Sequence, residues 1–292
     1  MERLARQDTT HRLDAVGLQS QPWEARLALR FANDHGTTRL VERRHSGPLR
    51  VQKALYPELP SVCHAIVVHP PGGIVGGDQL SIGIEVGAHA SAFLSSPGAA
   101  KWYRAGGRIS RQKLQMAVGP HASLEWMPQE TILFDAAEVE LDCEISLAAH
   151  ATYIGCEILC FGRTASGESF HDGGVTQRTR IRRDGKLIWF EQGRLQAGTP
   201  TMSSAQGLAG NRVCATLIAA GKQVPAALLQ AIRDELEPLA PGFGITQLKQ
   251  ALVARYLGDR SELARHAMLT AWRHLRPVLI GHPGVTPRIW NT

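Results

Sequence analysis

Apolar and polar side chains alternate along much of the chain between residue 22 and about residue 200. The clearest runs cover residues 23–31, 80–86 and 139–147. In the last of these, Leu141 and Cys143 each stand between two acidic residues. Successive side chains of a strand point to opposite faces, so each run predicts a strand with one buried face.

Turn signals separate these runs. Asp184-Gly185 lies between residues 179–183 and 186–190, which predicts a hairpin. Further turn clusters occupy residues 33–36, 70–77, 106–107 and 172–174. Many short strands with regular turns favour a sandwich, a barrel or a β-solenoid over a βαβ fold. No repeat of fixed length is visible, so the pattern does not demand a solenoid.

The period changes after about residue 222. Apolar residues recur every four positions in three stripes, which predict amphipathic helices packed on the β body. The stripes are Leu228, Ile232 and Leu236; Leu248, Leu252 and Tyr256; and Leu263, Ala267, Ala271, Leu275 and Leu279. We therefore expect a flexible segment at 1–21 and one domain at 22–292. The domain divides into a β body at about 22–205, a helical part at about 222–280 and a tail at 281–292.

Composition excludes several classes of protein. The net charge is +6, but the basic residues are dispersed and aromatic residues make up only 6%, which disfavours a nucleic-acid interface. No apolar run approaches the ~18 residues that a membrane helix needs. The five cysteines form no Cys-x-x-Cys pair and residues 1–11 carry no signal sequence, so we expect a reduced, cytoplasmic protein.

Catalytic motifs are missing. The sequence has no Gly-x-Ser-x-Gly, no phosphate-binding loop with Gly-Lys-Ser/Thr, and no His-Glu-x-x-His. These absences favour a protein that is not an enzyme.

Carboxylates and one histidine form the candidate metal-binding set. The Gly- and Pro-rich segment 69–78 places His69 near Asp78, and it is either a rigid presenting loop or a tight strand connection capped by Asp78. Glu157 shares a strand face with Leu159 and Phe161, and Glu191 shares one with Leu187 and Trp189.

An acid on an apolar face is costly unless it is paired, hydrated or metal-bound. Glu157 and Glu191 are therefore either salt-bridged or line a wet internal passage. Carboxylate and imidazole groups suit a borderline divalent metal such as nickel. The opposite face of the same strand carries Cys156 and Cys160, which are core thiols or a metal pair.

The ordered motifs of the whole chain resemble the UreD (UreH) family of urease accessory proteins. The motifs are Ser46-Gly47-Pro48-Leu49, Leu55-Tyr56-Pro57, Cys63-His64, residues 69–78, Lys101-Trp102-Tyr103-Arg104, residues 124–130, residues 159–163, Leu275-Arg276-Pro277 and Pro287-Arg288-Ile289-Trp290. Two positions depart from the pattern: Ala100 stands where Ser or Thr is usual, and Cys156 where an aromatic residue is frequent.

The resemblance implies a mainly β fold, with a solenoid-like body and a small C-terminal helical part. It implies a cytoplasmic complex with the UreF and UreG accessory proteins on apo-urease, in which this chain is a scaffold and metallochaperone for transient nickel. It also implies that Asp78, Glu157 and Glu191 match acidic positions of the family's nickel path.

Two other functions stay open. A β-rich metal-dependent hydrolase would use His69, Asp78 and Glu157, and would need these ligands to converge with one coordination position free. A plain interaction scaffold would need no metal at all. A nickel passage instead predicts that the acidic side chains are spread along an internal channel and do not converge on one point.

Overall fold

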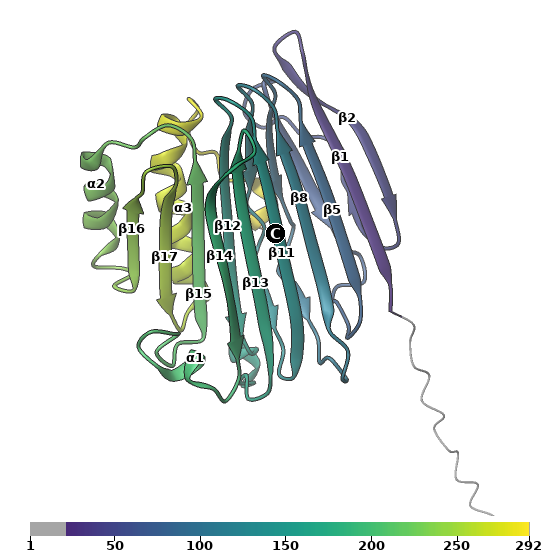
Figure 1. The fold of residues 1–292 in the computed structure, drawn as a ribbon, viewed down its shortest axis with the longest axis vertical. Coiled ribbons are helices and arrows are strands. Elements are labelled where there is room, and N and C mark those ends of the chain that lie inside the picture. Colours follow the sequence, from purple (N-terminus) through teal and green to yellow (C-terminus); the bar gives the residue numbers. More distant parts are fainter. Residues whose placement is uncertain (1–21, 292) are drawn as a thin grey trace, which may run out of the picture.

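Two stacked β-sheets form the body of the protein (Figure 1). The computed structural model describes residues 22–291. The seven-stranded sheet has the order β14 (Lys186–Gln196), β13 (Gly173–Arg183), β11 (Ala137–Leu147), β8 (Ser110–Val118), β5 (Gln79–Val86), β1 (Glu24–Asp34) and β2 (Thr37–Ser46). Its strands confirm the expected alternation, because buried and exposed positions alternate along β1, β5 and β8.

The second sheet has ten strands. Its main path is β16 (Phe243–Gln247), β17 (Leu252–Gly258), β15 (Val213–Ala220), β12 (Thr152–Phe161), β9 (Ser123–Trp126), β6 (Ser91–Ser95), β4 (Val62–Val68) and β3 (Arg50–Val51). The short strands β10 (Thr131–Leu133) and β7 (Ala100–Trp102) extend it beside the second half of β12.

Apart from the short strands β7 and β10, which stay in the ten-stranded sheet, the chain alternates between the sheets from β4 to β13, and the strands that it adds to each sheet run parallel. This winding confirms the mainly β, solenoid-like fold. The coils differ in length, since the parallel strands of the seven-stranded sheet begin at residues 79, 110, 137 and 173. Unequal coils explain why no repeat of fixed length is visible in the sequence.

Two longer helices cover the outer face of the ten-stranded sheet, and a short one contacts β14 of the other sheet. The helices are α1 (Pro200–Ser203), α2 (Ala226–Leu236) and α3 (Ser261–Leu279), with 3-10 turns at Thr164–Ser166 and Arg288–Asn291. One core fills the space between the sheets, and a second lies between the ten-stranded sheet and α2 and α3. Figure 1 shows α3, in yellow, behind β15 and β17. Within residues 22–291 no helix is long and apolar enough to cross a membrane.

The helix expected around Leu248, Leu252 and Tyr256 is wrong, because this region forms β16 and β17. A spacing of four is also even, so it fits a strand as well as a helix. Leu252, Ala254 and Tyr256 face the helices, whereas Arg255 is exposed. The predicted helical part at 222–280 is therefore two helices separated by a hairpin. The segment predicted to be flexible, 1–21, lies outside the described residues.

Candidate functional site

Glu157 lies in the middle of β12, on the face turned toward the seven-stranded sheet. Leu159 and Phe161 belong to the core between the sheets. Cys156 and Cys160 belong to the core beneath the helices. The prediction that Glu157 shares a face with Leu159 and Phe161 is therefore confirmed, and the two cysteines lie on the other side of the sheet.

A cavity of about 350 Å³ opens around Glu157. It lies where β11, β12, β13 and β14 approach β15 and β17. Its polar and sulfur-bearing lining includes Cys143, Glu157, Gln177, Glu191, Cys214 and Arg255. A polar space of this size has room for several water molecules, since one needs only about 10–15 Å³.

Glu157 has an uncompensated charge when it is ionised. The Nε2 atom of Gln177 donates a hydrogen bond to its Oε2 atom over 2.5 Å. Within residues 22–291 the Glu157 carboxylate makes no ion pair. Its pKa is raised to about 7, mainly by burial; the Gln177 hydrogen bond opposes this rise and the Glu191 charge adds to it. Near neutral pH this carboxyl group therefore exists in both protonated and ionised forms.

Glu191 lies at the rim of the same cavity, on the edge strand β14. Its carboxylate pairs with Arg255 of β17 over 2.5 Å, which connects the two sheets across their open side. The two side chains are 34% and 52% exposed, in contrast to the interior position of Glu157. One acid thus lies inside the cavity and the other at its mouth.

The face predicted for Glu191 needs one correction. A β-bulge shifts the pairing of β13 with β14, so that Trp189 lies opposite Ile181 whereas Leu187 lies opposite Arg182. Trp189 consequently packs against the core, but Leu187 is exposed. Glu191 shares its face with Trp189 and not with Leu187.

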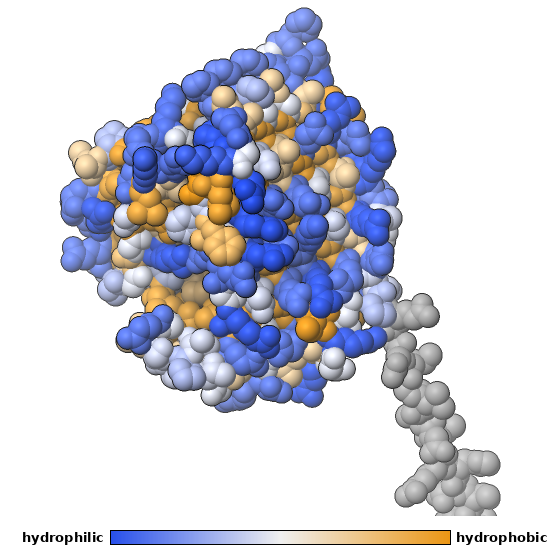
Figure 2. All heavy atoms as spheres, viewed as in Figure 1, coloured by the Kyte–Doolittle hydropathy of each residue, from blue (hydrophilic) through white to orange (hydrophobic). Residues whose placement is uncertain are grey.

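Exposed apolar side chains lie on the outer side of the same strand. Leu187 is 44% exposed and Phe190 is 54% exposed. Figure 2 shows hydrophobic side chains among hydrophilic ones on the face where Figure 1 places β14. These two side chains lie on the same edge strand as Glu191, and neither lines the cavity.

Two thiols line the cavity that were not among the predicted site residues. Cys143 comes from β11 and Cys214 from β15. Burial raises the pKa of Cys214 to about 12 and raises that of Cys143 well above its ordinary value. Both are therefore protonated at neutral pH and would ligate a metal only on losing that proton. The sequence does hold a signal for Cys143, because the alternation over residues 139–147 places it on the buried face of its strand.

Asp78 and His69 occupy the loop that joins β4 to β5, outside the lining of this cavity. The buried Asp78 carboxylate accepts hydrogen bonds from the backbone N–H groups of Trp23 (2.9 Å) and Val75 (3.0 Å). Asp78 therefore caps a tight strand connection, which was one of the two expectations for this loop. Burial lowers the pKa of His69, and the nearby Asp78 charge opposes that effect.

The predicted acids do not gather into one metal centre. Across residues 22–291, no group of three or more His, Cys, Asp and Glu side chains is placed to hold a metal ion. A hydrolase built on His69, Asp78 and Glu157 would need such convergence, so the geometry disfavours that alternative.

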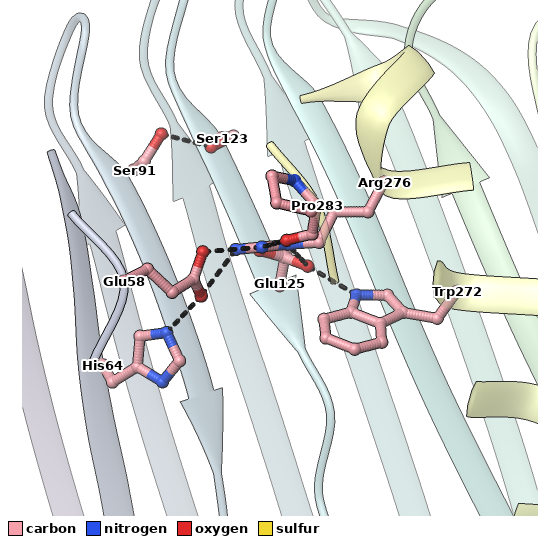
Figure 3. Close-up of polar contacts among 8 residues, drawn as sticks. All are labelled: Glu58, His64, Ser91, Ser123, Glu125, Trp272, Arg276 and Pro283. Atoms are coloured by element: carbon pink, nitrogen blue, oxygen red, sulfur yellow. Dashed lines mark hydrogen bonds and ion pairs between the residues drawn. The ribbon is translucent and has the colours of Figure 1, made fainter. Parts of the chain in front are cut away.

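A buried charge network forms a second polar centre, on the other face of the ten-stranded sheet (Figure 3). Arg276 of α3 lies between Glu58 and Glu125, and its nitrogens contact their carboxylates at 2.7–3.0 Å. Glu125 also accepts a hydrogen bond from Trp272, and Glu58 bonds His64. The network joins α3 to the sheet.

Burial and pairing act in opposite directions on these acids. Burial raises the pKa of Glu125, although Arg276 and Trp272 oppose it. Burial acts in the same sense on Glu58, but the contacts of His64 and Arg276 together lower its pKa below the ordinary value. Sequence reasoning singled out the motifs around these residues but not their pairing, because Glu58 and Arg276 lie 218 positions apart.

Comparison with known proteins identifies the family. The sequence model of the UreD urease accessory proteins matches residues 24–291. The urease accessory protein UreD of Janthinobacterium sp. (strain Marseille) is 60% identical over 92% of this chain and 92% of its own length. That of Nitrosospira multiformis is 52% identical over 93% and 98%, and that of Dechloromonas aromatica 47% over 94% and 96%. This chain therefore belongs to the UreD family of urease accessory proteins.

Proposed function

We propose that this chain is a urease maturation factor that passes nickel toward the active site of apo-urease and catalyses no reaction itself. Family membership supports the role in urease maturation. The observation that carries the nickel role is Glu157, a carboxylate without an ion pair among the described residues, which faces a cavity lined by both polar and apolar side chains.

The chemistry of Glu157 suits temporary binding. A carboxyl group with a pKa of about 7 loses its proton readily at neutral pH. Ni²⁺ arriving in the cavity displaces that proton, and the returning proton helps to release the ion. Cys143 of β11 and Cys214 of β15 lie on opposite sheets of the cavity and add softer donors once a bound metal displaces their protons. Few ligands at any one point keep the binding weak, as transfer requires.

Glu191 and Arg255 control the mouth of the cavity in this proposal. Their ion pair is partly exposed to solvent and therefore contributes little stability, so it opens readily. A cation that reaches the rim replaces Arg255 as the partner of Glu191 and then moves inward to Glu157. The roles of Asp78 and His69 on the same route stay a prediction.

The partners that we propose are UreF, UreG and apo-urease, in a cytoplasmic complex. The exposed apolar side chains of Leu187 and Phe190 support a protein contact beside the cavity mouth. A net charge of +6 favours partners with acidic surfaces. A contact at this rim would let the cavity continue into a neighbouring subunit without passing through bulk water.

The experiment is urease maturation in cells that co-express urease with its accessory proteins. Leaving out this chain should abolish the nickel content and activity of urease. Glu157→Gln and Glu191→Gln should each lower nickel content severalfold while the complex still copurifies. The matched control is Glu140→Gln, because Glu140 forms an equally short ion pair with Arg111 in the same sheet but does not line the cavity.

The outcomes separate the two parts of the proposal. Normal urease without this chain would contradict the maturation role. Normal nickel content with both cavity variants would contradict the passage but would leave a plain scaffold. Equal losses in Glu157→Gln and the Glu140→Gln control would mean that any lost charge disturbs the complex.

A further inference from the structure

Three histidines form a ladder across successive coils of the solenoid. His89, His121 and His150 occupy the turns that connect β5 to β6, β8 to β9 and β11 to β12. The rings of His89 and His121 stack with centroids 5.1 Å apart, and those of His121 and His150 stack with centroids 4.8 Å apart. The rings are nearly parallel, with interplanar angles of 4° and 17°.

The backbone holds these imidazoles in register. All three histidines have positive φ, between 55° and 60°, which is uncommon for residues other than glycine. The N–H of His89 donates to the carbonyl of Pro120, and that of His121 donates to the carbonyl of Ala149. Each turn is thus bonded to the next, and the side chains project at the spacing of the coils.

The imidazoles are exposed, and their nitrogens are available. All three residues lie on the surface. Apart from the ring stacking, their side chains make no hydrogen bond or ion pair with the rest of residues 22–291. Exposed imidazole nitrogens without a hydrogen-bond partner among the described residues thus lie on adjacent coils.

We propose that adjacent imidazoles of this ladder chelate one borderline divalent cation, such as Ni²⁺ or Cu²⁺, on the surface of the protein. Neutral imidazole is a preferred ligand of both ions. The inference is independent of the internal passage, because the ladder lies outside the cavity, at the end of the solenoid opposite the Asp78 loop.

Chelation needs only a small movement. Two nitrogens that each bind a metal at about 2.1 Å stand no more than roughly 4 Å apart, so the stacked rings must tilt toward each other. Exposed side chains change rotamer within nanoseconds. No set of three ligands is preformed among the described residues, so two imidazoles bind and water completes the coordination shell.

The test is titration of the full-length chain with NiCl₂, followed by isothermal calorimetry. His121→Asn removes the imidazole that both pairs share, and asparagine tolerates positive φ. The matched control is His35→Asn, because His35 is also exposed, has a φ of 49° and stacks with no other ring among the described residues.

We expect one Ni²⁺ per ladder. Because the second imidazole binds intramolecularly, His121→Asn should weaken binding about a hundredfold, whereas His35→Asn should not change it. His89→Asn and His150→Asn should each weaken binding by about twofold, since each leaves one pair intact. The variant that carries both His89→Asn and His150→Asn should bind Ni²⁺ as weakly as His121→Asn does.

A spectroscopic measurement tests the ligands directly. Electron paramagnetic resonance of bound Cu²⁺ should show two coordinated imidazole nitrogens in the wild type and one in His121→Asn. Circular dichroism should report the same fold for every variant. Unchanged Ni²⁺ affinity in His121→Asn, or an equal loss in His35→Asn, would overturn the proposal.

Discussion

Replacing Glu157 with glutamine should stabilise the folded protein, and the gain should grow with pH. The pKa of this carboxyl group is about 7 in the folded chain, against an ordinary value of 4.5. Between these values the folded state holds more protons than the unfolded state does. Stability therefore falls as the pH rises from about 4.5 through about 7.

The size of the effect follows from the shift. The rise of this pKa from 4.5 to about 7 costs the folded state roughly 3 kcal/mol once the pH exceeds both values, and about 1 kcal/mol at pH 5. Glu157 borders the cavity and is not fully buried, so solvent screening makes both free-energy differences smaller. Glutamine carries no charge, and it can still accept the hydrogen bond from Gln177. The variant should therefore gain about 2–3 kcal/mol at pH 8.

Urea unfolding of the purified full-length chain at pH 5, 6, 7 and 8 measures this difference. Glu140→Gln is the control, since its side chain is exposed to solvent and its replacement should change stability by less than about 1 kcal/mol at every pH. A difference between wild type and Glu157→Gln that is constant from pH 5 to pH 8 would refute the reasoning. So would a variant that is less stable at pH 8.

Two further substitutions test the structural account, each by thermal or urea unfolding. Arg276→Met leaves the buried carboxylates of Glu58 and Glu125 without their shared cation, so stability should fall by about 3–5 kcal/mol, and a loss below about 1 kcal/mol would contradict the network. Gly76→Ala should destabilise by more than about 1 kcal/mol because the added methyl group meets the backbone of a neighbouring loop, whereas Gly98→Ala, which faces open space, should be nearly neutral.

The sequence predicted best what depends on local alternation. Successive side chains of a strand point to opposite faces, so the inward position of Glu157 could be read from its neighbours Leu159 and Phe161. The neighbours Cys63 and His64 follow the same rule, since Cys63 joins the core between the sheets and His64 stacks on Phe93 in the core beneath the helices. Alternation alone left a sandwich, a barrel and a β-solenoid open, and the family resemblance favoured the solenoid.

Features that depend on irregular backbone or distant pairing could not be predicted. A β-bulge in the pairing of β13 with β14 places Leu187 on the outer face. The apolar residues Leu248, Leu252 and Tyr256 recur every four positions, which led to the prediction of a helix where β17 forms. Glu191 meets Arg255 across 64 positions of sequence. The cavity is lined by residues from strands of both sheets that lie far apart in the sequence, so no local pattern could predict it.

The most direct test of the passage is to block it. Thr216 lines the cavity and pairs in register with both Glu157 and Arg255, so Thr216→Phe should fill the space between them. The matched control is Thr176→Phe, because Thr176 is also half-buried but lies on a sheet strand outside the cavity lining.

The measurement is the number of nickel ions per urease active site after maturation with each variant, with copurification of the accessory complex as the check on folding. The account predicts nickel-poor urease with Thr216→Phe and fully loaded urease with Thr176→Phe. Fully loaded urease with Thr216→Phe, in an intact complex, would contradict the claim that nickel travels through this cavity.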